Sequence, residues 1–249
     1  MKGLGWLVYK AVRGLARVFF PRPELVGLEN IPDEGCVLVG NHAQMHGPVL
    51  CELYLPFKRA IWCTGEMMHL KEVPKYARTV FWGDKPKRVK WLYGILSYII
   101  APFSAAVFNN AYCIGVYRDA RLTGTFRKTL EKLSEGTRVV IFPESPTPRN
   151  AIIYEFHDRF IALGRMFARQ AGKSLAFVPM YVTPALRKIC FGKPVYYDPA
   201  SSPEAEMRRV CDALMAGVTE LGKSLPRHRV VPFWNLPKKD YPMNRPEEE

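Results

Sequence analysis

The stretch Cys36-Val-Leu-Val-Gly-Asn-His-Ala-Gln-Met-His-Gly47 joins a short apolar run to a polar segment that contains two histidines. Its apolar part, residues 36–40, has the length and composition of a buried strand. Asn41, His42 and His46 follow directly, at the strand end where open α/β sheets bind their ligands. A histidine at such a position can act as a general base at neutral pH. The stretch therefore predicts a buried strand with a candidate site at its carboxyl end.

Outward from this strand, apolar runs alternate with amphipathic segments. Strands are predicted at 59–64, 112–116, 138–142 and 176–182, and helices at 47–55, 125–134, 156–172 and 201–223. Two short runs, 189–191 and 194–197, predict a small hairpin about Gly192-Lys193. Alternation of this kind is typical of an α/β fold in which a mixed central sheet is flanked by helices.

The first residues predict an amphipathic helix that precedes the α/β domain. Apolar side chains recur at helical spacing from Leu4 to Phe19, while Lys10, Arg13 and Arg17 share the other face. A basic amphipathic helix suits a membrane surface, and we expect residues 1–22 to form a membrane-anchoring helix. A helix docked on the protein's own core is the alternative.

A second apolar region, residues 91–117, carries no charged side chain. Its length reaches the roughly 20 residues that span a bilayer, but glycine, proline and asparagine interrupt it. We expect a helix in or near the membrane interface over 91–108, followed by a turn at Asn109-Asn110. A buried core helix is the alternative.

Composition bounds the class of partner. The chain has 249 residues, with 36 Lys and Arg against 23 Asp and Glu, so its formal net charge is +13. Such a charge indicates anionic partners: phosphate ligands, anionic lipid or nucleic acid. The six cysteines form no C-x-x-C pair, which is typical of reduced thiols in the cytosol. Five prolines after Leu225 predict a largely extended tail over 226–249, which leaves 23–225 as the α/β domain.

Two further predicted strands end in side chains that can hold an anion or a hydroxyl group. Arg118 follows 112–116, and Glu144 and Arg149 follow 138–142. The planar guanidinium of arginine suits a phosphate, and a glutamate can hold an arginine or a substrate hydroxyl. Together with the His42 segment, these strand ends predict one composite site.

In order and spacing, these blocks resemble those of the glycerolipid acyltransferases, whose best-known members are the 1-acyl-glycerol-3-phosphate acyltransferases. The likeness extends from about Val26 to Lys223. Asn41-His42 is similar to the start of the family's N-H-x-x-x-x-D block, and Arg118 to the arginine of its second block. Residues 133–144 are similar to the approach to its F-P-E-G-T-R block, and Phe177-Val-Pro179 to its fourth block.

The resemblance implies that His42 deprotonates an acceptor hydroxyl, which attacks the thioester of acyl-CoA or acyl carrier protein. It also implies that Glu144 and Arg118 belong to the acceptor site and that Pro179 shapes a substrate pocket. Asn41 and Arg149 complete the expected substrate-binding set. The expected partners are membrane lipid, a lysophospholipid acceptor and the acyl donor, with no cofactor, no metal and no nucleic acid.

Two places depart from the family pattern. Gly47 stands where the family has the aspartate that orients the histidine, and His46 and Glu52 are the nearest candidates to replace it in the catalytic set. The family's Gly-Thr-Arg becomes Ser145-Pro-Thr-Pro-Arg149, in which two prolines remove backbone donors.

The predicted function is therefore a membrane-associated acyltransferase at the cytoplasmic face of the cell membrane, peripheral or monotopic. The departures favour the alternative of a catalytically silent relative that binds lipid or a partner protein. His42 and His46, four residues apart, could also share a metal ion in a metal hydrolase, but no third ligand stands at a matching spacing, and Cys36, Cys51 and His69 are only nearby in sequence. Nucleic-acid binding would explain the charge but not the apolar regions.

Overall fold

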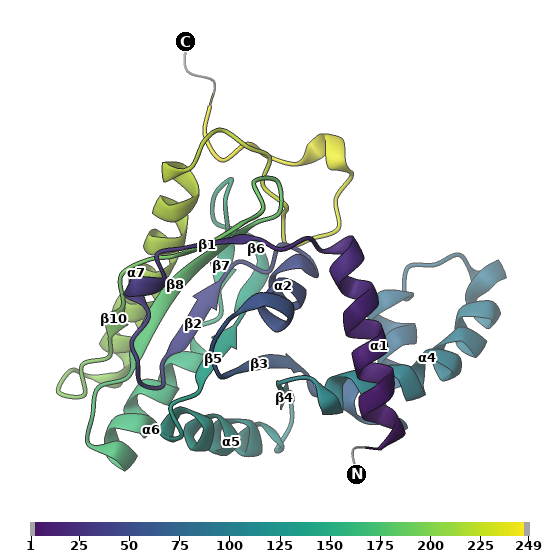
Figure 1. Ribbon diagram of the computed structural model, residues 1–249, viewed down its shortest axis with the longest axis horizontal. Helices are drawn as coiled ribbons and strands as arrows, with labels where there is room; N and C mark the ends of the chain where they lie inside the picture. The colour runs from purple at the N-terminus through teal and green to yellow at the C-terminus, as the bar shows by residue number, and fades with distance from the viewer. Residues whose placement is uncertain (1–2, 247–249) are drawn as a thin grey trace. The chain divides into compact units, whose positions relative to one another are not determined.

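The computed structural model describes residues 3–246 and has a mixed α/β fold (Figure 1). Residues 1–2 and 247–249, the outer ends of the predicted 1–22 and 226–249 segments, lie outside the described residues. Contacts divide the chain into two units. The first unit comprises Met1–Phe19 and Ile61–Lys128, and the second comprises Phe20–Ala60 and Thr129–Glu249. The predicted central sheet flanked by helices is confirmed.

The second unit is built on a mostly parallel sheet in the order β1-β9-β8-β2-β5. These strands are β1 (Glu24–Val26), β2 (Val37–Gly40), β5 (Arg138–Ile141), β8 (Ala176–Thr183) and β9 (Lys188–Phe191). Strands β2, β5 and β8 are parallel neighbours, and β9 runs antiparallel to β8. All residues of β2 and β8 are buried, as continuous apolar runs in a covered sheet require.

Side chains of β8 contact helices on both faces of the sheet in this unit. Gly217 and Gly222 of α7 (Pro203–Ser224) lie against Pro179 and Tyr181. Between those two residues, Met180 faces the other way and meets Cys51 of α2 (His46–Tyr54), with 3.9 Å between their sulfur atoms. Because side chains alternate along a strand, α7 and α2 cover opposite faces of the sheet.

Two sequence predictions in this unit are wrong. The predicted hairpin about Gly192-Lys193 does not form, because β9 and β10 (Val195–Tyr196) both pair with β8 as two parts of one antiparallel neighbour. The predicted helix 156–172 begins only at α6 (Ala162–Ala171), after the turn η5 (Arg159–Ile161). Its first residue instead ends β7 (Tyr154–Phe156), which pairs with β6 (Glu144–Pro148).

The first unit contains the long helices of the N-terminal half. Strand β3 (Arg59–Thr64) begins in the second unit and pairs in parallel with β4 (Cys113–Val116) from Ile61 onward. Helices α1 (Leu4–Phe19) and α4 (Lys90–Asn110) pack together, with Gly5 beside Ala106 and Asn110. The predicted turn at Asn109-Asn110 is instead the last turn of α4. Helix α5 (Leu122–Ser134) starts in this unit and ends in the other.

Short turns complete the chain: η1 (Leu28–Asn30), η2 (Gly65–Met68), α3 (Val73–Tyr76), the π-turn η3 (Ala77–Phe81), η4 (Lys87–Val89) and η6 (Lys238–Asp240). Of these, η2, α3 and η3 lie beside α4 and give the first unit a small core of Met67, Val73 and Ala101.

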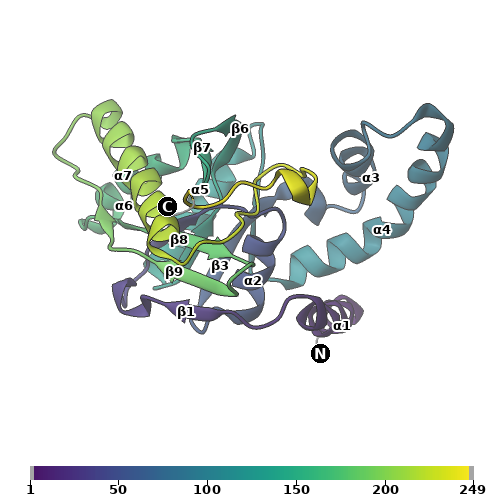
Figure 2. The ribbon, with the colours of Figure 1, turned by 90° about the horizontal axis from the view of Figure 1, so that it is seen from above.

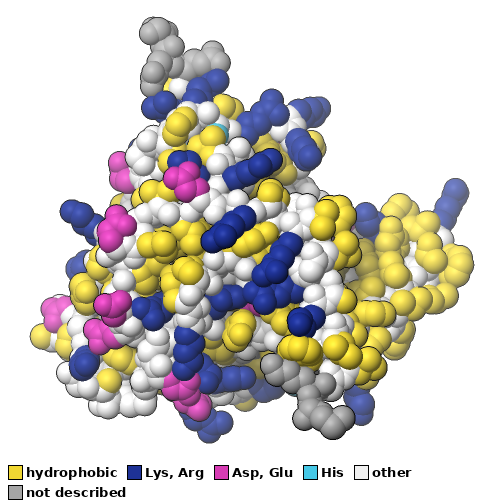
Figure 3. Space-filling model, in the orientation of Figure 1, with side chains coloured by type: hydrophobic (Ala, Val, Ile, Leu, Met, Phe, Trp, Pro, Cys, Tyr) yellow, Lys and Arg dark blue, Asp and Glu magenta, His cyan; other side chains and the backbone are white. Residues whose placement is uncertain are grey.

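The first unit exposes many large apolar side chains. Trp91 of α4 is 67% exposed and Ile95, Ile99 and Phe103 are each more than half exposed. Figure 3 shows apolar side chains gathered over this helix. The segment Lys87–Asn110 is long and apolar enough to cross a membrane by length and composition, which is weak evidence on its own. Its low burial contradicts the alternative of a buried core helix.

The chain after α7 closes into a loop. Arg229 and Met243 form an antiparallel bridge, and the Val230 N–H donates to the Pro242 carbonyl over 2.8 Å. Figure 2 shows this segment, in yellow, running out to the turn η6 and back. We call residues 231–241, between the bridged ends, the strap.

Candidate active site

Asn41 fixes the start of the loop that follows β2. Its amide group donates to the Val182 carbonyl over 3.0 Å and accepts from the Val182 N–H over 2.7 Å. The residue is 2% exposed. Both ends of the predicted substrate-binding amide are thus engaged with β8, and they hold the loop at the carboxyl end of the sheet.

His42 is held through its backbone and its ring. Its N–H donates to Glu144 Oε2 over 2.5 Å, and its Nδ1 is hydrogen-bonded to the Gln44 carbonyl. A carbonyl oxygen only accepts, so Nδ1 carries the proton and Nε2 keeps its lone pair. Within residues 3–246, no hydrogen bond is made to Nε2. The ring is therefore in the tautomer that a general base at Nε2 requires.

Aromatic side chains surround this ring. Phe142, which follows β5, and Phe233 of the strap each meet it edge-on, with ring centroids 5.4 and 5.9 Å away. Burial lowers the pKa of the His42 imidazole, and the hydrogen bond to Gln44 opposes that shift. The base is therefore neutral, and able to accept a proton, at neutral pH.

Glu144 links the His42 loop to the β6–β7 ribbon. It is 6% exposed and accepts two backbone N–H groups, from His42 and, over 3.0 Å, from Tyr154. Burial raises the pKa of its carboxyl to about 7, although both donors act to lower it. The structure thus brings His42 and Glu144 together, as predicted. The Glu144 carboxylate contacts the backbone N–H of His42 rather than its ring.

The two predicted replacements for the motif aspartate make other contacts. His46 donates from Nδ1 to the Ala43 carbonyl over 3.1 Å and packs its ring on Phe20. Glu52 lies 3.7 Å from the guanidinium of Arg59. Their predicted catalytic roles are not supported by these contacts, because the acceptor on His42 Nδ1 is the Gln44 carbonyl.

Position 47 has no room for a carboxylate. A Cβ atom on Gly47 would lie 2.7 Å from both the His42 carbonyl oxygen and the Phe142 ring. The Gly47 N–H donates to that same carbonyl over 3.0 Å. The loop is thus closed too tightly at Gly47 for any side chain.

The remaining predicted residues make contacts of their own or lie in the other unit. Arg149 pairs with Glu155 at 3.2 Å and lies 3.9 Å from Asp212. Pro179 is buried in β8, with its ring against Gly192 and Gly217. Arg118 belongs to the first unit and is exposed. The substrate-binding roles of these three residues stay predictions.

Four residues at or next to the His42 ring were not predicted from the sequence: Gln44, Phe233, Trp234 and Tyr241. Gln44 Nε2 donates to the Trp234 carbonyl over 3.2 Å and to the Tyr241 hydroxyl over 3.0 Å. The indole N–H of Trp234 donates to the Pro146 carbonyl over 3.2 Å. The one available signal was an aromatic pair, Phe233-Trp234, in a proline-rich tail.

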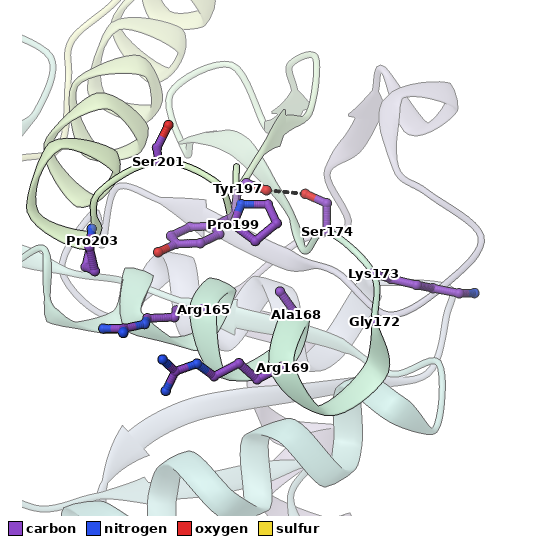
Figure 4. A pocket seen from close by; sticks show the side chains of 10 residues that line it. All are labelled: Arg165, Ala168, Arg169, Gly172, Lys173, Ser174, Tyr197, Pro199, Ser201 and Pro203. Carbon is purple, nitrogen blue, oxygen red and sulfur yellow. Dashed lines mark hydrogen bonds between the residues drawn. The ribbon is translucent and has the colours of Figure 1, made fainter.

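A separate cavity of about 320 Å³ is lined in part by Tyr197 (Figure 4). It lies near the amino end of β8, because the Tyr197 N–H donates over 3.0 Å to the carbonyl of Leu175, the residue before β8. Arg165, Arg169 and Lys173 are among its lining residues, and Tyr197 forms part of its wall. His42 follows the carboxyl end of β2, which is parallel to β8. The cavity and His42 therefore lie toward opposite ends of the sheet.

The part of the chain that the structure describes contains no set of side chains suited to bind a metal ion. No group of three or more His, Cys, Asp and Glu side chains there is arranged to hold a metal ion. The six cysteines, all within residues 3–246, are free thiols. The His42–His46 spacing is thus not completed by a third ligand among these residues.

No protein-family model matches the chain, and no curated protein matches it at a significant level. Its fold, however, is shared with a solved acyltransferase structure. That structure is the 1-acyl-sn-glycerophosphate (LPA) acyltransferase PlsC from Thermotoga maritima, with a TM-score of 0.50 and 18% identity. The match covers 89% of this chain and 81% of PlsC. At this identity the likeness is one of fold.

Proposed function

We propose that the chain is a membrane-associated acyltransferase. It would move a fatty acyl group from acyl-CoA or acyl carrier protein to the hydroxyl of a lysophospholipid-like acceptor. The observation that carries this proposal is the state of His42: its Nδ1 donates to the Gln44 carbonyl, and within residues 3–246 no hydrogen bond is made to its Nε2. The site lies in a fold shared with PlsC, a 1-acyl-sn-glycerophosphate (LPA) acyltransferase.

The reaction follows from the free lone pair on Nε2. His42 takes the proton of the acceptor hydroxyl as its oxygen attacks the thioester carbonyl carbon. The carbon–sulfur bond breaks when the tetrahedral intermediate collapses, and the imidazolium returns the proton to the thiolate. Glu144 would hold the loop backbone during these steps through the His42 N–H.

The first unit supports the membrane part of the proposal. Many large apolar side chains of α1 and α4 are exposed, and Lys85, Lys87, Arg88 and Lys90 are grouped at the start of α4. Basic residues beside an exposed apolar helix suit an anionic lipid surface. We place this surface on the cytoplasmic face of the membrane, as a peripheral or monotopic contact.

A catalytically silent relative that binds lipid or a partner protein is the second candidate. Two observations favour it: Gly47 brings no negative charge to His42, and Phe233 covers one edge of the ring. In the serine-protease triad, loss of the orienting carboxylate costs about 10⁴ in turnover.

Acyl transfer by the purified protein on anionic vesicles distinguishes these candidates. Labelled acyl-CoA and acyl carrier protein are each offered with a panel of lysolipids. Labelled lipid product that is lost in the His42→Ala variant supports the enzyme. Vesicle binding without product, from folded protein and with every donor, supports the silent relative. His157→Ala, which changes an exposed histidine elsewhere in the second unit, is the matched control.

A further inference from the structure

Gln44 lies between the strap and the candidate base. Its side-chain amide donates to the Trp234 carbonyl and the Tyr241 hydroxyl of the strap. Its own backbone carbonyl accepts the Nδ1 proton of His42. One residue therefore connects the strap to the ring of the base through two hydrogen bonds on one side and one on the other.

The backbone at Gln44 needs such support. Ala43 and Gln44 both have positive φ, 46° and 55°. This is a left-handed backbone conformation that residues other than glycine rarely adopt. Two such residues in succession persist only where surrounding contacts hold them. Beyond the hydrogen bond from His42 itself, the strap supplies two contacts of this kind, both to the Gln44 side chain.

The strap is itself well anchored at both ends. Asn244, just beyond it, donates to the Gly222 carbonyl of α7 over 2.9 Å and accepts the His228 N–H over 2.8 Å. His228 is hydrogen-bonded to the Tyr181 hydroxyl of β8 over 2.9 Å. The strap is thus anchored on the sheet and on α7, and it contacts the loop that carries His42.

We propose that Gln44 is the positioning residue of His42, and that the strap holds it in the conformation that keeps the Nδ1 proton in place. The proposal rests on the acyltransfer function only for its kinetic consequence. During transfer, Nε2 gains the acceptor's proton and later gives it to the leaving thiolate, while the other proton stays on Nδ1 and remains hydrogen-bonded to the Gln44 carbonyl. The carbonyl fixes the tautomer and supplies a partial rather than a full negative charge.

Two variants separate this role from general folding. Gln44→Asn keeps an amide and suits left-handed φ, but its shorter side chain cannot make both contacts with the strap. Tyr241→Phe removes a single hydroxyl acceptor. Tyr196→Phe, at an exposed tyrosine in β10, removes a hydroxyl outside this network and is the matched control.

The first readout is independent of activity. In protein labelled with ¹⁵N-histidine, the ring nitrogen shifts of neutral His42 report which nitrogen carries the proton. We expect the Nδ1–H form in the wild type and in Tyr196→Phe, and a mixture with the Nε2–H form in Gln44→Asn. An unchanged Nδ1–H signal in both Gln44→Asn and Tyr241→Phe, or an Nε2–H wild type, overturns the proposal.

The second readout is a split between kcat and KM. In metal sites, removing the group that orients a ligating histidine typically costs about 10- to 100-fold, and we expect kcat for acyl transfer to fall by a similar factor in Gln44→Asn. Tyr241→Phe should fall less, and KM should stay within about threefold because no substrate contact is removed. A rise in KM with kcat unchanged overturns the positioning role. A wild type that transfers no acyl group refutes the proposed function, and the tautomer measurement then still decides the role of Gln44.

Discussion

At the scale of single residues, the glycine at position 47 is required by packing. Because a Cβ there would meet the His42 carbonyl and the Phe142 ring at 2.7 Å, we expect Gly47→Asp to destabilise the protein rather than to improve catalysis. Overpacking of this kind costs about 1–3 kcal/mol. Urea unfolding and acyl transfer measure the two effects. Gly124→Asp, at a glycine in α5 with open space around it, is the control. A Gly47→Asp variant of wild-type stability and higher activity would contradict this packing.

Glu144 makes the stability of the protein depend on pH. The pKa of its carboxyl is about 7 in the folded protein, against an ordinary 4.5. Between these values the folded state binds more protons than the unfolded state, so this group's contribution to the free energy of unfolding falls as pH rises. Glu144→Gln does not titrate, and its stability relative to the wild type should increase by up to about 3 kcal/mol between pH 5 and pH 8, at about 1.4 kcal/mol per pK unit.

Urea unfolding of both proteins across that pH range tests this expectation. Glu220→Gln, at a carboxylate with 75% of its side chain exposed, controls for the loss of a charge. Parallel stability profiles for the wild type and Glu144→Gln would show that the carboxyl is ionised throughout.

The roles of individual residues were only partly predictable. His42 and Glu144 stand out in sequence because each follows a strand and each matches a motif. Gln44 carries no such signal, because its left-handed backbone, the role of its main-chain carbonyl and the distant partners of its side chain arise only in the folded chain. The residue type alone predicts none of these features.

At the scale of elements, local signals located most strands and helices. The predicted strand 59–64 is β3, and the predicted helix 201–223 is α7, whose cap is Ser202 accepting from the Ala205 N–H. Strand β7 was missed because its three residues are a strand only through pairing with β6. The strap was missed for the same reason: prolines and polar residues carry no periodicity, and its contacts lie far away in sequence.

Asn244 anchors the strap just beyond its second end. Its amide serves both the Gly222 carbonyl and the His228 N–H in a site that is 4% exposed. Asn244→Ala leaves these two buried groups unpaired, and we expect a loss of about 1–3 kcal/mol in the free energy of unfolding. Hydrogen exchange should also rise across residues 228–244. Lys238→Ala, in the exposed turn η6, should change neither measurement. Unchanged exchange in Asn244→Ala would show that the strap is held elsewhere.

At the scale of the whole molecule, a basic chain with an exposed apolar helix should bind anionic vesicles. Ile95 and Ile99 lie one turn apart on α4 and are 53% and 56% exposed. Replacing both with glutamate puts like charge against an anionic surface, and we expect vesicle affinity to fall at least about tenfold, or about 1.4 kcal/mol. Higher salt should also weaken wild-type binding.

Co-sedimentation with anionic vesicles measures this loss. Leu28→Glu, at an exposed leucine of the second unit, adds a charge away from α4 and should retain binding. Equal losses in both proteins would assign the membrane contact to net charge rather than to the apolar face of α4.

The strap also has a consequence for the order in which the molecule matures. Gln44 lies 190 positions before Trp234 and 197 before Tyr241, and the strap is synthesised after every strand of the sheet. Pairings this distant along the chain close late, since the entropy of a long loop must be overcome first. A newly made or refolding chain should therefore form its sheet before the contacts between Gln44 and the strap at the candidate site. In a refolding experiment we expect far-ultraviolet circular dichroism to recover first and the proposed acyl transfer to lag behind it, so that a chain can be folded in its sheet before its strap closes.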